Sequence, residues 1–332
     1  MKKFVVCLLG CAVVLGAEAQ LINGAGSSFG YPAFTKWSEA YAAVDSAVHV
    51  NYRSVGSGAG QQLLVKETVD FGASDGPMSD DNLAKAPRTL WHFPTVAGAD
   101  VITYNIPGDA KLKIDGATIA GIFLGKIVKW NDPAIAGQNP DLKLPDADIV
   151  VVHRSDGSGT TYIFTDYLSN VSADWKAKVG KGTSVSWPTG IGGKGNEGVS
   201  GQVKQVPGSI GYVELVYAKQ NKLPYADVKN SSGNYVTPSI ESVTEALAAA
   251  DIPADFRFSM VNPPGATAYP IAGTTWLLVY AEQKDHAKGE KLVQFLKWAY
   301  SDGEKLAPAL DYAPLPDALI KRALEKVQSI KY

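Results

Sequence analysis

The stretch Ile149–Leu168, IVVVHRSDGSGTTYIFTDYL, contains residues whose types and spacing suit the binding of an anion. Arg154 carries a permanent positive charge, and Asp156 can orient its guanidinium so that the planar fork pairs with two anion oxygens. The following segment, Ser158–Thr160, supplies hydroxyl groups, small side chains and backbone N–H donors. The chemistry expected of this turn is hydrogen bonding to a negatively charged ligand and neutralisation of its charge.

A strand and a helix must position this turn. Ile149–Val152 is apolar and β-branched, which predicts a buried strand. After the turn, Ile163, Phe164, Tyr167 and Leu168 recur at helical spacing. The first N–H groups of a helix have no intrahelical partner and lie at the positive end of its dipole, which favours a bound anion.

Two other glycine-serine turns, Gly26–Phe29 and Gly56–Gly60, resemble the first. Each is predicted to open a helix, and Ser28 is placed to cap the earlier one. In α/β sheets ligands gather beyond the carboxyl ends of strands, so three such turns can surround one small oxyanion. For any one turn taken alone, an ordinary turn or cap explains the composition as well.

Asp75 follows a short predicted strand over 71–73 and is unexpected beside an anion, because a carboxylate repels one. The placement makes sense if the anion carries a proton that Asp75 accepts, whereas a fully deprotonated ion would face it lone pair to lone pair. An unmade buried hydrogen bond costs about 1–3 kcal/mol, which gives a means of choosing hydrogen phosphate over sulfate. The alternatives are that Asp75 only stabilises its own turn, and that Arg154 is an ordinary surface charge or a partner for Asp156 alone.

Strand and helix patterns alternate along the rest of the chain, which predicts α/β sheets flanked by helices with many parallel pairs. The expected strands are 48–52, 71–73, 96–104, 149–152, 210–213 and 269–280, and the main expected helices are 34–41, 63–69, 117–124, 197–206, 240–250, 290–300 and 317–330. A length of 332 residues favours two domains or one large one. Because no linker divides the chain cleanly, two domains would be connected by more than one crossing.

Residues 1–19 have the pattern of an export signal: Lys2 and Lys3, an apolar run, and a small-x-small ending before Gln20. We do not expect lipidation at Cys11, because cleavage there would leave a very short apolar region. Removal of the signal also removes both cysteines of the chain, so neither disulfides nor a cysteine metal site is expected.

The remaining 29 basic and 32 acidic residues give a net charge of −3, which suggests no nucleic-acid partner. No later apolar run reaches the roughly 18 residues of a membrane span, so no anchor is expected.

Six motifs carry a resemblance when they are taken together and in order. They are Gly24–Phe29, Asp70–Asp75, Gly125–Ile127 with Trp130–Asp132, Arg154–Thr160, Gly192–Asn196 and Gly208–Tyr212. As a set spread over most of the mature chain, they resemble the periplasmic phosphate-binding proteins of bacterial phosphate ABC importers. The resemblance implies a two-lobed α/β venus-flytrap fold, type II-like, with each lobe a sheet flanked by helices and inorganic phosphate bound in the cleft.

By the same resemblance, the phosphate ligands would be Ser28, Phe29 through its backbone N–H, Ser57, Asp75, Arg154, Ser158, Gly159 and Thr160, with Asp156 supporting Arg154. The family often has Thr where this chain has Ser28, and either supplies a hydroxyl. Residues 20–95 and 269–332 would form the first lobe and residues 96–268 the second. The resemblance further implies a monomeric, periplasmic, non-enzymatic receptor that needs no cofactor and delivers phosphate to membrane permease subunits. In it, Asp75 would accept the phosphate proton and reject sulfate.

Enzymatic alternatives have weaker support. Gly26–Gly30 matches the G-x-S-x-G nucleophile elbow, but little chain precedes it to form the required sheet. Gly190–Gly195 matches G-x-G-x-x-G, but we expect a loop there because Trp187-Pro188 is a poor end for a central strand. His153 is expected to be a packing or surface residue, and no histidine-carboxylate cluster indicates a metal site. Within the binding class, the main alternative is a receptor for another oxyanion such as sulfate.

Overall fold

The computed structural model describes residues 20–108 and 111–332, so the predicted export signal and the Cys11 lipidation motif lie outside the described residues. The elements up to the first long strand are β1 (Gln20–Gly26), α1 (Tyr31–Val44), β2 (Val48–Ser54), α2 (Ser57–Val65), β3 (Phe71–Ser74), α3 (Asp80–Leu83) and β4 (Leu90–Tyr104). The middle elements are β5 (Lys113–Ile114), α4 (Gly116–Phe123), α5 (Pro133–Ala136), β6 (Val150–Arg154), α6 (Gly159–Val171), α7 (Ala173–Lys178), β7 (Ile191–Gly193), α8 (Gly195–Gln205), β8 (Ser209–Glu214), α9 (Leu215–Gln220), β9 (Asp227–Lys229), β10 (Tyr235–Val236) and α10 (Ile240–Ala248). The chain ends with β11 (Met260–Val261), β12 (Ile271–Tyr280), α11 (His286–Trp298), the short helices η1 (Ala299–Gly303), η2 (Glu304–Leu306) and η3 (Pro308–Leu310), and α12 (Asp317–Gln328).

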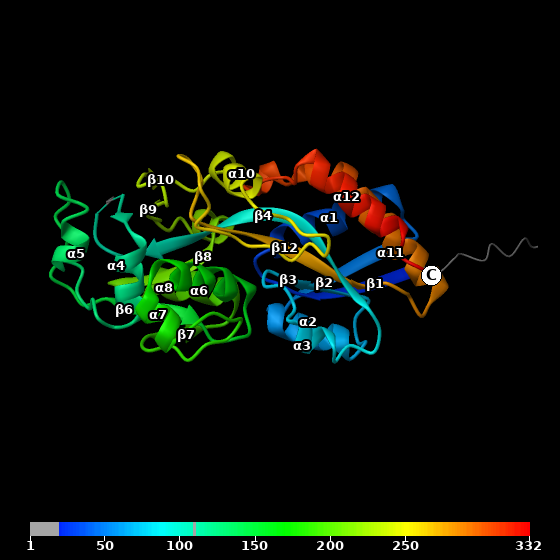
Figure 1. The fold of residues 1–332 in the computed structure, drawn as a ribbon, viewed down its shortest axis with the longest axis horizontal. Helices are drawn as coiled ribbons and strands as arrows, with labels where there is room; N and C mark the ends of the chain where they lie inside the picture. The colour runs from blue at the N-terminus through cyan, green and yellow to red at the C-terminus, as the bar shows by residue number, and fades with distance from the viewer. Residues whose placement is uncertain (1–19, 109–110) are drawn as a thin grey trace, which may run out of the picture.

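The molecule has two lobes side by side (Figure 1). One contains β1, β2 and β3, which pair in parallel, together with α1, α2, α11 and α12. The other contains β6, β7 and β8, also paired in parallel, with α4 and α6–α8 around them. This arrangement confirms the predicted fold class of two α/β lobes with helices flanking their sheets.

The two long strands β4 and β12 connect the lobes. The strand order is β2-β1-β3-β12-β4-β8-β6-β7, so both lie in the middle of it. β4 pairs with β12 as far as Ala99 and with β8 from Asp100 onward. The chain therefore passes between the lobes in both directions, as predicted from the absence of a linker. A separate three-stranded sheet, β10-β9-β5, lies in the second lobe.

The predicted helical spacings correspond to buried faces. In α1, Phe34, Trp37 and Tyr41 are buried, and the Trp37 indole donates to the Gly303 carbonyl at 2.8 Å. In α6, the four residues that suggested a helix in the sequence are all buried. Burying side chains of this size stabilises a fold by about 1.5–3 kcal/mol each, so these faces fix where the helices lie on the sheets.

Three local predictions are wrong. The helix expected over 63–69 begins earlier and ends at Val65, so Val69 lies beyond α2. Ser28 does not cap α1: the residue before the helix is Gly30, whose N–H donates to Ser27 Oγ at 3.1 Å. The segment Gly190–Gly195 is not a loop throughout, because it contains the short edge strand β7 and the start of α8. Trp187-Pro188 precedes β7 instead of lying in it, so the proline removes no hydrogen bond from the sheet.

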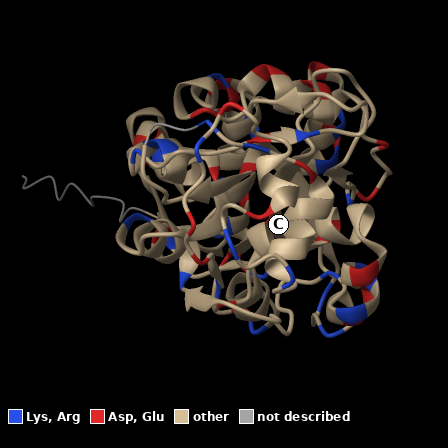
Figure 2. Cartoon of the chain, turned by 90° about the vertical axis from the view of Figure 1, so that its left-hand side faces the viewer, with Lys and Arg blue, Asp and Glu red and all other residues tan. Residues whose placement is uncertain are grey.

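Within residues 20–108 and 111–332, no helix combines the length and the apolar character that crossing a membrane requires. Basic and acidic residues are interspersed over the end of the second lobe (Figure 2). Several of them form exposed ion pairs there, such as Lys126 with Asp174 and Lys129 with Asp146.

Candidate anion-binding site

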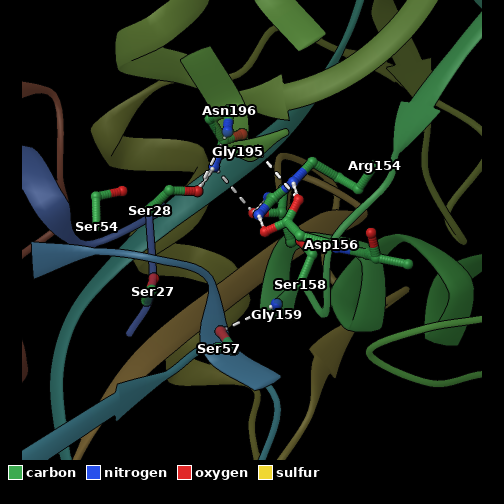
Figure 3. Close-up of polar contacts among 12 residues, drawn as sticks. Ser27, Ser28, Ser54, Ser57, Arg154, Asp156, Ser158, Gly159, Gly195 and Asn196 are labelled. Atoms are coloured by element: carbon green, nitrogen blue, oxygen red, sulfur yellow. Dashed lines mark hydrogen bonds and ion pairs between the residues drawn. The ribbon is translucent and has the colours of Figure 1, made fainter. Parts of the chain in front are cut away.

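The three glycine-serine turns meet at one place between the lobes (Figure 3). The Gly58 N–H donates to the Gly157 carbonyl at 2.9 Å, and the Gly159 N–H donates to Ser57 Oγ at 3.0 Å. Both contacts join the start of α2 in the first lobe to the start of α6 in the second. All of the residues predicted to bind the ligand are buried, namely Ser28, Phe29, Ser57, Asp75, Arg154, Ser158, Gly159 and Thr160.

The approach of the two lobes depends on glycines. A Cβ on Gly157 would lie 3.1 Å from the Gly58 Cα, and a Cβ on Gly159 would lie 2.5 Å from the Asp75 backbone nitrogen and side chain. Gly56 has a φ of 88°, a conformation that strongly favours glycine, immediately before α2 begins. The small residues of the turns are therefore required by backbone contact between the lobes.

Arg154 is held in a fixed orientation at the end of β6. Its Nε and Nη2 donate to the two oxygens of Asp156 at 2.8 and 2.6 Å, and its Nη1 donates to Thr160 Oγ1 at 3.3 Å. The Gly195 N–H donates to Asp156 at 3.0 Å. Burial raises the pKa of Asp156, but the hydrogen bonds and charge of Arg154 outweigh it, and the pKa is lowered overall. The buried guanidinium is thus a permanent positive charge at the meeting point of the turns.

Asp75 brings a carboxylate to the same place. One of its oxygens accepts from Ser27 Oγ and from Thr275 Oγ1, the latter at 2.6 Å, and the other accepts a long bond of 3.4 Å from Ser57. Burial raises the pKa of Asp75 to about 6, against the opposing effect of these hydroxyls and of Arg154. At neutral pH the group is therefore mostly ionised and can only accept hydrogen bonds.

The loop between β1 and α1 has unpaired donors. In the described part of the chain, the backbone N–H groups of Ser28 and Phe29 donate to no other group, although both residues are buried. Their carbonyls are paired, with the hydroxyls of Tyr217 at 2.6 Å and Tyr312 at 2.5 Å, so the loop is firmly held. Buried N–H groups without a partner are rare in proteins and are expected where a ligand accepts from them.

Three residues at the site did not figure in the predicted ligand set. Ser27 and Thr275 contact Asp75, and the buried Asn196 donates to Ser28 Oγ at 2.9 Å and to Thr160 Oγ1 at 3.1 Å. Ser27 and Asn196 lie within the quoted motifs Gly24–Phe29 and Gly192–Asn196, which was the available signal. Thr275 lies inside β12 and has no local signal, because only the sheet pairing brings it to Asp75.

Residues with other possible chemistry do not join the site. The ring of His153 stacks on Trp187, with ring centres 4.8 Å apart, and burial lowers the pKa of His153, so of the two expected alternatives, packing and surface, it packs. Among residues 20–108 and 111–332, no three His, Cys, Asp or Glu side chains are grouped so that they could hold a metal ion. In the part of the chain that the structure describes, no histidine bonds to Ser28, whose Oγ accepts from Asn196 instead.

Comparison with known proteins identifies the relatives of this chain. A family model described as a PBP superfamily domain matches residues 15–303. The chain is 48% identical to a phosphate-binding protein PstS of Xylella fastidiosa strain Temecula1, over 91% of this chain and 83% of that protein. It is 44% identical to a phosphate-binding protein PstS of Pasteurella multocida, over 97% and 94% of the two chains.

Solved structures show the same fold. A high-affinity periplasmic phosphate-binding protein called PfluDING, bound with phosphate, matches with a TM-score of 0.73 and 22% identity, over 90% of this chain and 92% of that one. A phosphate-binding protein from Stenotrophomonas maltophilia matches with a TM-score of 0.70 and 21% identity, over 92% and 94%. The curated relatives are named as binding proteins, in agreement with the prediction that this chain is not an enzyme. The chain belongs to the PBP superfamily and, within it, to the family of PstS phosphate-binding proteins.

Proposed function

We propose that this protein captures inorganic phosphate between its lobes and delivers it to the permease subunits of an ABC importer. The observation that carries the proposal is the buried grouping of Arg154 with the unpaired N–H groups of Ser28 and Phe29. A permanent cation and several donors in a water-free place are complementary to a small oxyanion. The names of the relatives select phosphate among such ions.

In this proposal the two lobes contribute different groups to the ion. Residues 20–95 and 269–332 form the first lobe, which supplies Ser28, the Phe29 N–H, Ser57 and Asp75. Residues 96–268 form the second, which supplies Arg154, Ser158, Gly159 and Thr160, with Asp156 supporting Arg154. Closure of the lobes excludes water and brings both sets of donors onto the ion. The proposal includes periplasmic location as a monomer after cleavage before Gln20, without cofactor, lipid or membrane anchor.

In this proposal Asp75 makes the site select phosphate over sulfate. Its carboxylate accepts the proton of hydrogen or dihydrogen phosphate, whereas sulfate offers only lone pairs to it. One Asp75 oxygen accepts only the 3.4 Å bond from Ser57 among the described residues, and this partly free oxygen supports the role. A sulfate receptor is the alternative, and titration with the two ions separates them.

Calorimetry on protein stripped of ligand by unfolding and refolding tests the proposal. We expect phosphate to bind and sulfate to bind much more weakly or not at all. In the Arg154→Ala variant, the phosphate Kd should rise at least about tenfold, or about 1.4 kcal/mol, because a buried charge-assisted contact is lost. Unchanged phosphate binding by this variant would refute the site assignment, and tighter binding of sulfate than of phosphate would favour the alternative.

An assay with a chromogenic phosphate ester tests the remaining enzymatic alternative. No turnover is expected. Turnover that disappears in the Ser28→Ala variant would show that the serine of Gly26–Gly30 acts as a nucleophile, contrary to the proposal.

A further inference from the structure

Asn196 lies at the start of α8, and its backbone N–H and its side-chain NH2 group both donate hydrogen bonds at the candidate site. Its side chain is fully buried. Its Nδ2 donates to Ser28 Oγ at 2.9 Å and to Thr160 Oγ1 at 3.1 Å, and its backbone N–H donates to the same Ser28 oxygen at 3.2 Å. Ser28 belongs to the first lobe and Thr160 to the second, so this one side chain connects hydroxyls from both sides.

The orientation of the Asn196 amide is determined by β8. Its Oδ1 accepts a hydrogen bond from the Glu214 backbone N–H at 3.0 Å. A backbone N–H can only donate, so the amide oxygen must face Glu214 and the NH2 group must face the two hydroxyls. Asn196 therefore presents donors to the site, and a flipped amide would lose the bond to Glu214.

The hydrogen bonds that the Ser28 and Thr160 hydroxyls accept determine how these hydroxyls can bind a ligand. A hydroxyl has two lone pairs and one hydrogen. Ser28 Oγ accepts twice from Asn196, and Thr160 Oγ1 accepts from Asn196 and from Arg154 at 3.3 Å. Within the described part of the chain, neither hydroxyl donates a hydrogen bond. With both lone pairs occupied, each hydroxyl has only its hydrogen to offer a ligand.

We propose that Asn196 is a positioning residue that makes the hydroxyls of Ser28 and Thr160 obligate hydrogen-bond donors to the bound anion. The inference rests on the proposed capture of phosphate between the lobes. It explains how rotatable hydroxyls, which can otherwise accept as well as donate, are fixed for an ion that offers mainly lone pairs. Because Ser28 and Asn196 come from different lobes, this arrangement is completed only when the lobes are closed.

Ser57 provides an internal comparison. Its Oγ also accepts two bonds, from the Asp75 N–H at 3.2 Å and the Gly159 N–H at 3.0 Å, but none from Asn196. The effect of Asn196 should therefore depend on the presence of the Ser28 hydroxyl and not on that of Ser57.

The test measures phosphate affinity of the ligand-stripped protein by calorimetry. Asn196→Ala should raise the phosphate Kd about tenfold. In the double variant with Ser28→Ala, the added effect of Asn196→Ala should fall to threefold or less, whereas with Ser57→Ala its full effect should remain. If the fold-losses of Asn196→Ala and Ser28→Ala simply multiply, as independent sites do, the proposal is overturned.

A second variant is needed because Asn196→Ala leaves the Glu214 N–H unpaired and could lower affinity by disturbing the fold. Asn196→Asp keeps that acceptor and replaces the NH2 donor with a second carboxylate oxygen, toward which the two hydroxyls would turn their hydrogens. Its phosphate Kd should rise at least about a hundredfold at pH 8, and the ratio to wild type should shrink toward pH 5.5, where a protonated carboxyl donates again. A ratio that does not change with pH would contradict the proposal.

Asn139→Asp is the matched control, since Asn139 is also buried and its amide donates to the Lys113 and Ile135 carbonyls away from the site. It should bind phosphate as wild type does, and thermal unfolding of each stripped variant reports on its folding. If wild-type protein fails to bind phosphate, the proposed function is wrong. If wild type binds and both Asn196 variants bind equally well, only the role of Asn196 is wrong.

Discussion

Asp75 is a carboxylate among hydrogen-bond donors, and its protonation state should decide which ions the site tolerates. Burial raises the pKa of Asp75 to about 6. Above that pH the carboxylate only accepts, so sulfate meets repulsion between lone pairs. Below it the protonated carboxyl can donate to a sulfate oxygen. Sulfate affinity of the wild-type protein should therefore rise as the pH falls, by roughly tenfold between pH 7.5 and pH 5.

Calorimetric titration of stripped protein with sulfate at the two pH values measures this change. The Asp75→Asn variant is the control, because an amide can turn its NH2 group toward sulfate at either pH. It should bind sulfate more tightly than wild type at pH 7.5 and show little dependence on pH. A wild-type sulfate affinity that is the same at both pH values, or an Asp75→Asn variant that rejects sulfate as strongly as wild type, would remove Asp75 from ion selection.

The sequence indicated the residues of the site whose role follows from local chemistry. Arg154 and Asp156 lie two positions apart at the end of one strand, and their pairing could be predicted from residue type alone. Asn196 was not assigned a role, because its contact with Ser28 joins residues 168 positions apart and depends on the closed lobes. Thr275 reaches Asp75 from 200 positions away, since β12 pairs with β3. Contacts of this range follow from topology, which residue types do not specify.

At the scale of elements, the strands and helices with clear periodicity were predicted, and the exceptions have physical causes. β4 begins at Leu90, although a strand was expected only from residue 96. Pro94 lies within it opposite Trp276, beside an irregularity in the pairing between Thr274 and Trp276 of β12. A proline is tolerated in a sheet at such a bulge, where the regular ladder of hydrogen bonds is already interrupted.

Two helix glycines should respond differently to replacement by alanine: one variant should lose phosphate affinity, and the other should gain stability. At Gly159, the first residue of α6, a Cβ would lie 2.5 Å from Asp75 in the other lobe, whereas at Gly201 inside α8 it would meet no described residue of another element within 4 Å. Gly159→Ala should therefore oppose closure and raise the phosphate Kd at least about tenfold. Gly201→Ala should leave the Kd unchanged and raise the free energy of unfolding by about 0.5–1 kcal/mol.

Calorimetry and urea unfolding of both variants, each stripped of ligand, test this pair. The unfolding measurement for Gly159→Ala shows whether its loss of affinity reflects a damaged fold or hindered closure. Wild-type phosphate affinity in Gly159→Ala would mean that the contact between α6 and Asp75 is not needed for binding.

At the scale of the whole molecule, β4 and β12 make the lobes parts of one continuous arrangement of strands. Asp100, where β4 changes partner from β12 to β8, is fully buried, and among the described residues neither of its side-chain oxygens has a hydrogen-bond partner. Burial raises the pKa of Asp100 well above its ordinary value. More than one crossing between the lobes could be expected from the sequence, but a buried carboxyl at this point could not, because it contradicts the usual preference of aspartate for the surface.

Glu304 provides a test of how such carboxyls affect the stability of the whole protein. It is 4% exposed, one oxygen accepts from the Leu315 N–H at 2.9 Å, and the other has no partner among the described residues. Burial raises the pKa of Glu304 from 4.5 to about 8. Its contribution to stability is therefore fully present below about pH 4.5 and is lost as the pH rises toward 8, because the unfolded chain then ionises more readily than the folded one.

The Glu304→Gln variant keeps an acceptor for the Leu315 N–H and removes the titration. Its free energy of unfolding relative to wild type should increase between pH 5 and pH 8.5 by at least about 1.4 kcal/mol, the value of one pKa unit. Urea unfolding of the two stripped proteins at both pH values measures this difference, and the absence of phosphate keeps ligand binding from shifting the equilibrium. A difference that stays constant with pH would mean that Glu304 ionises equally well in the folded and unfolded chains. In that case its burial would have no effect on its titration, contrary to what its unpaired oxygen implies.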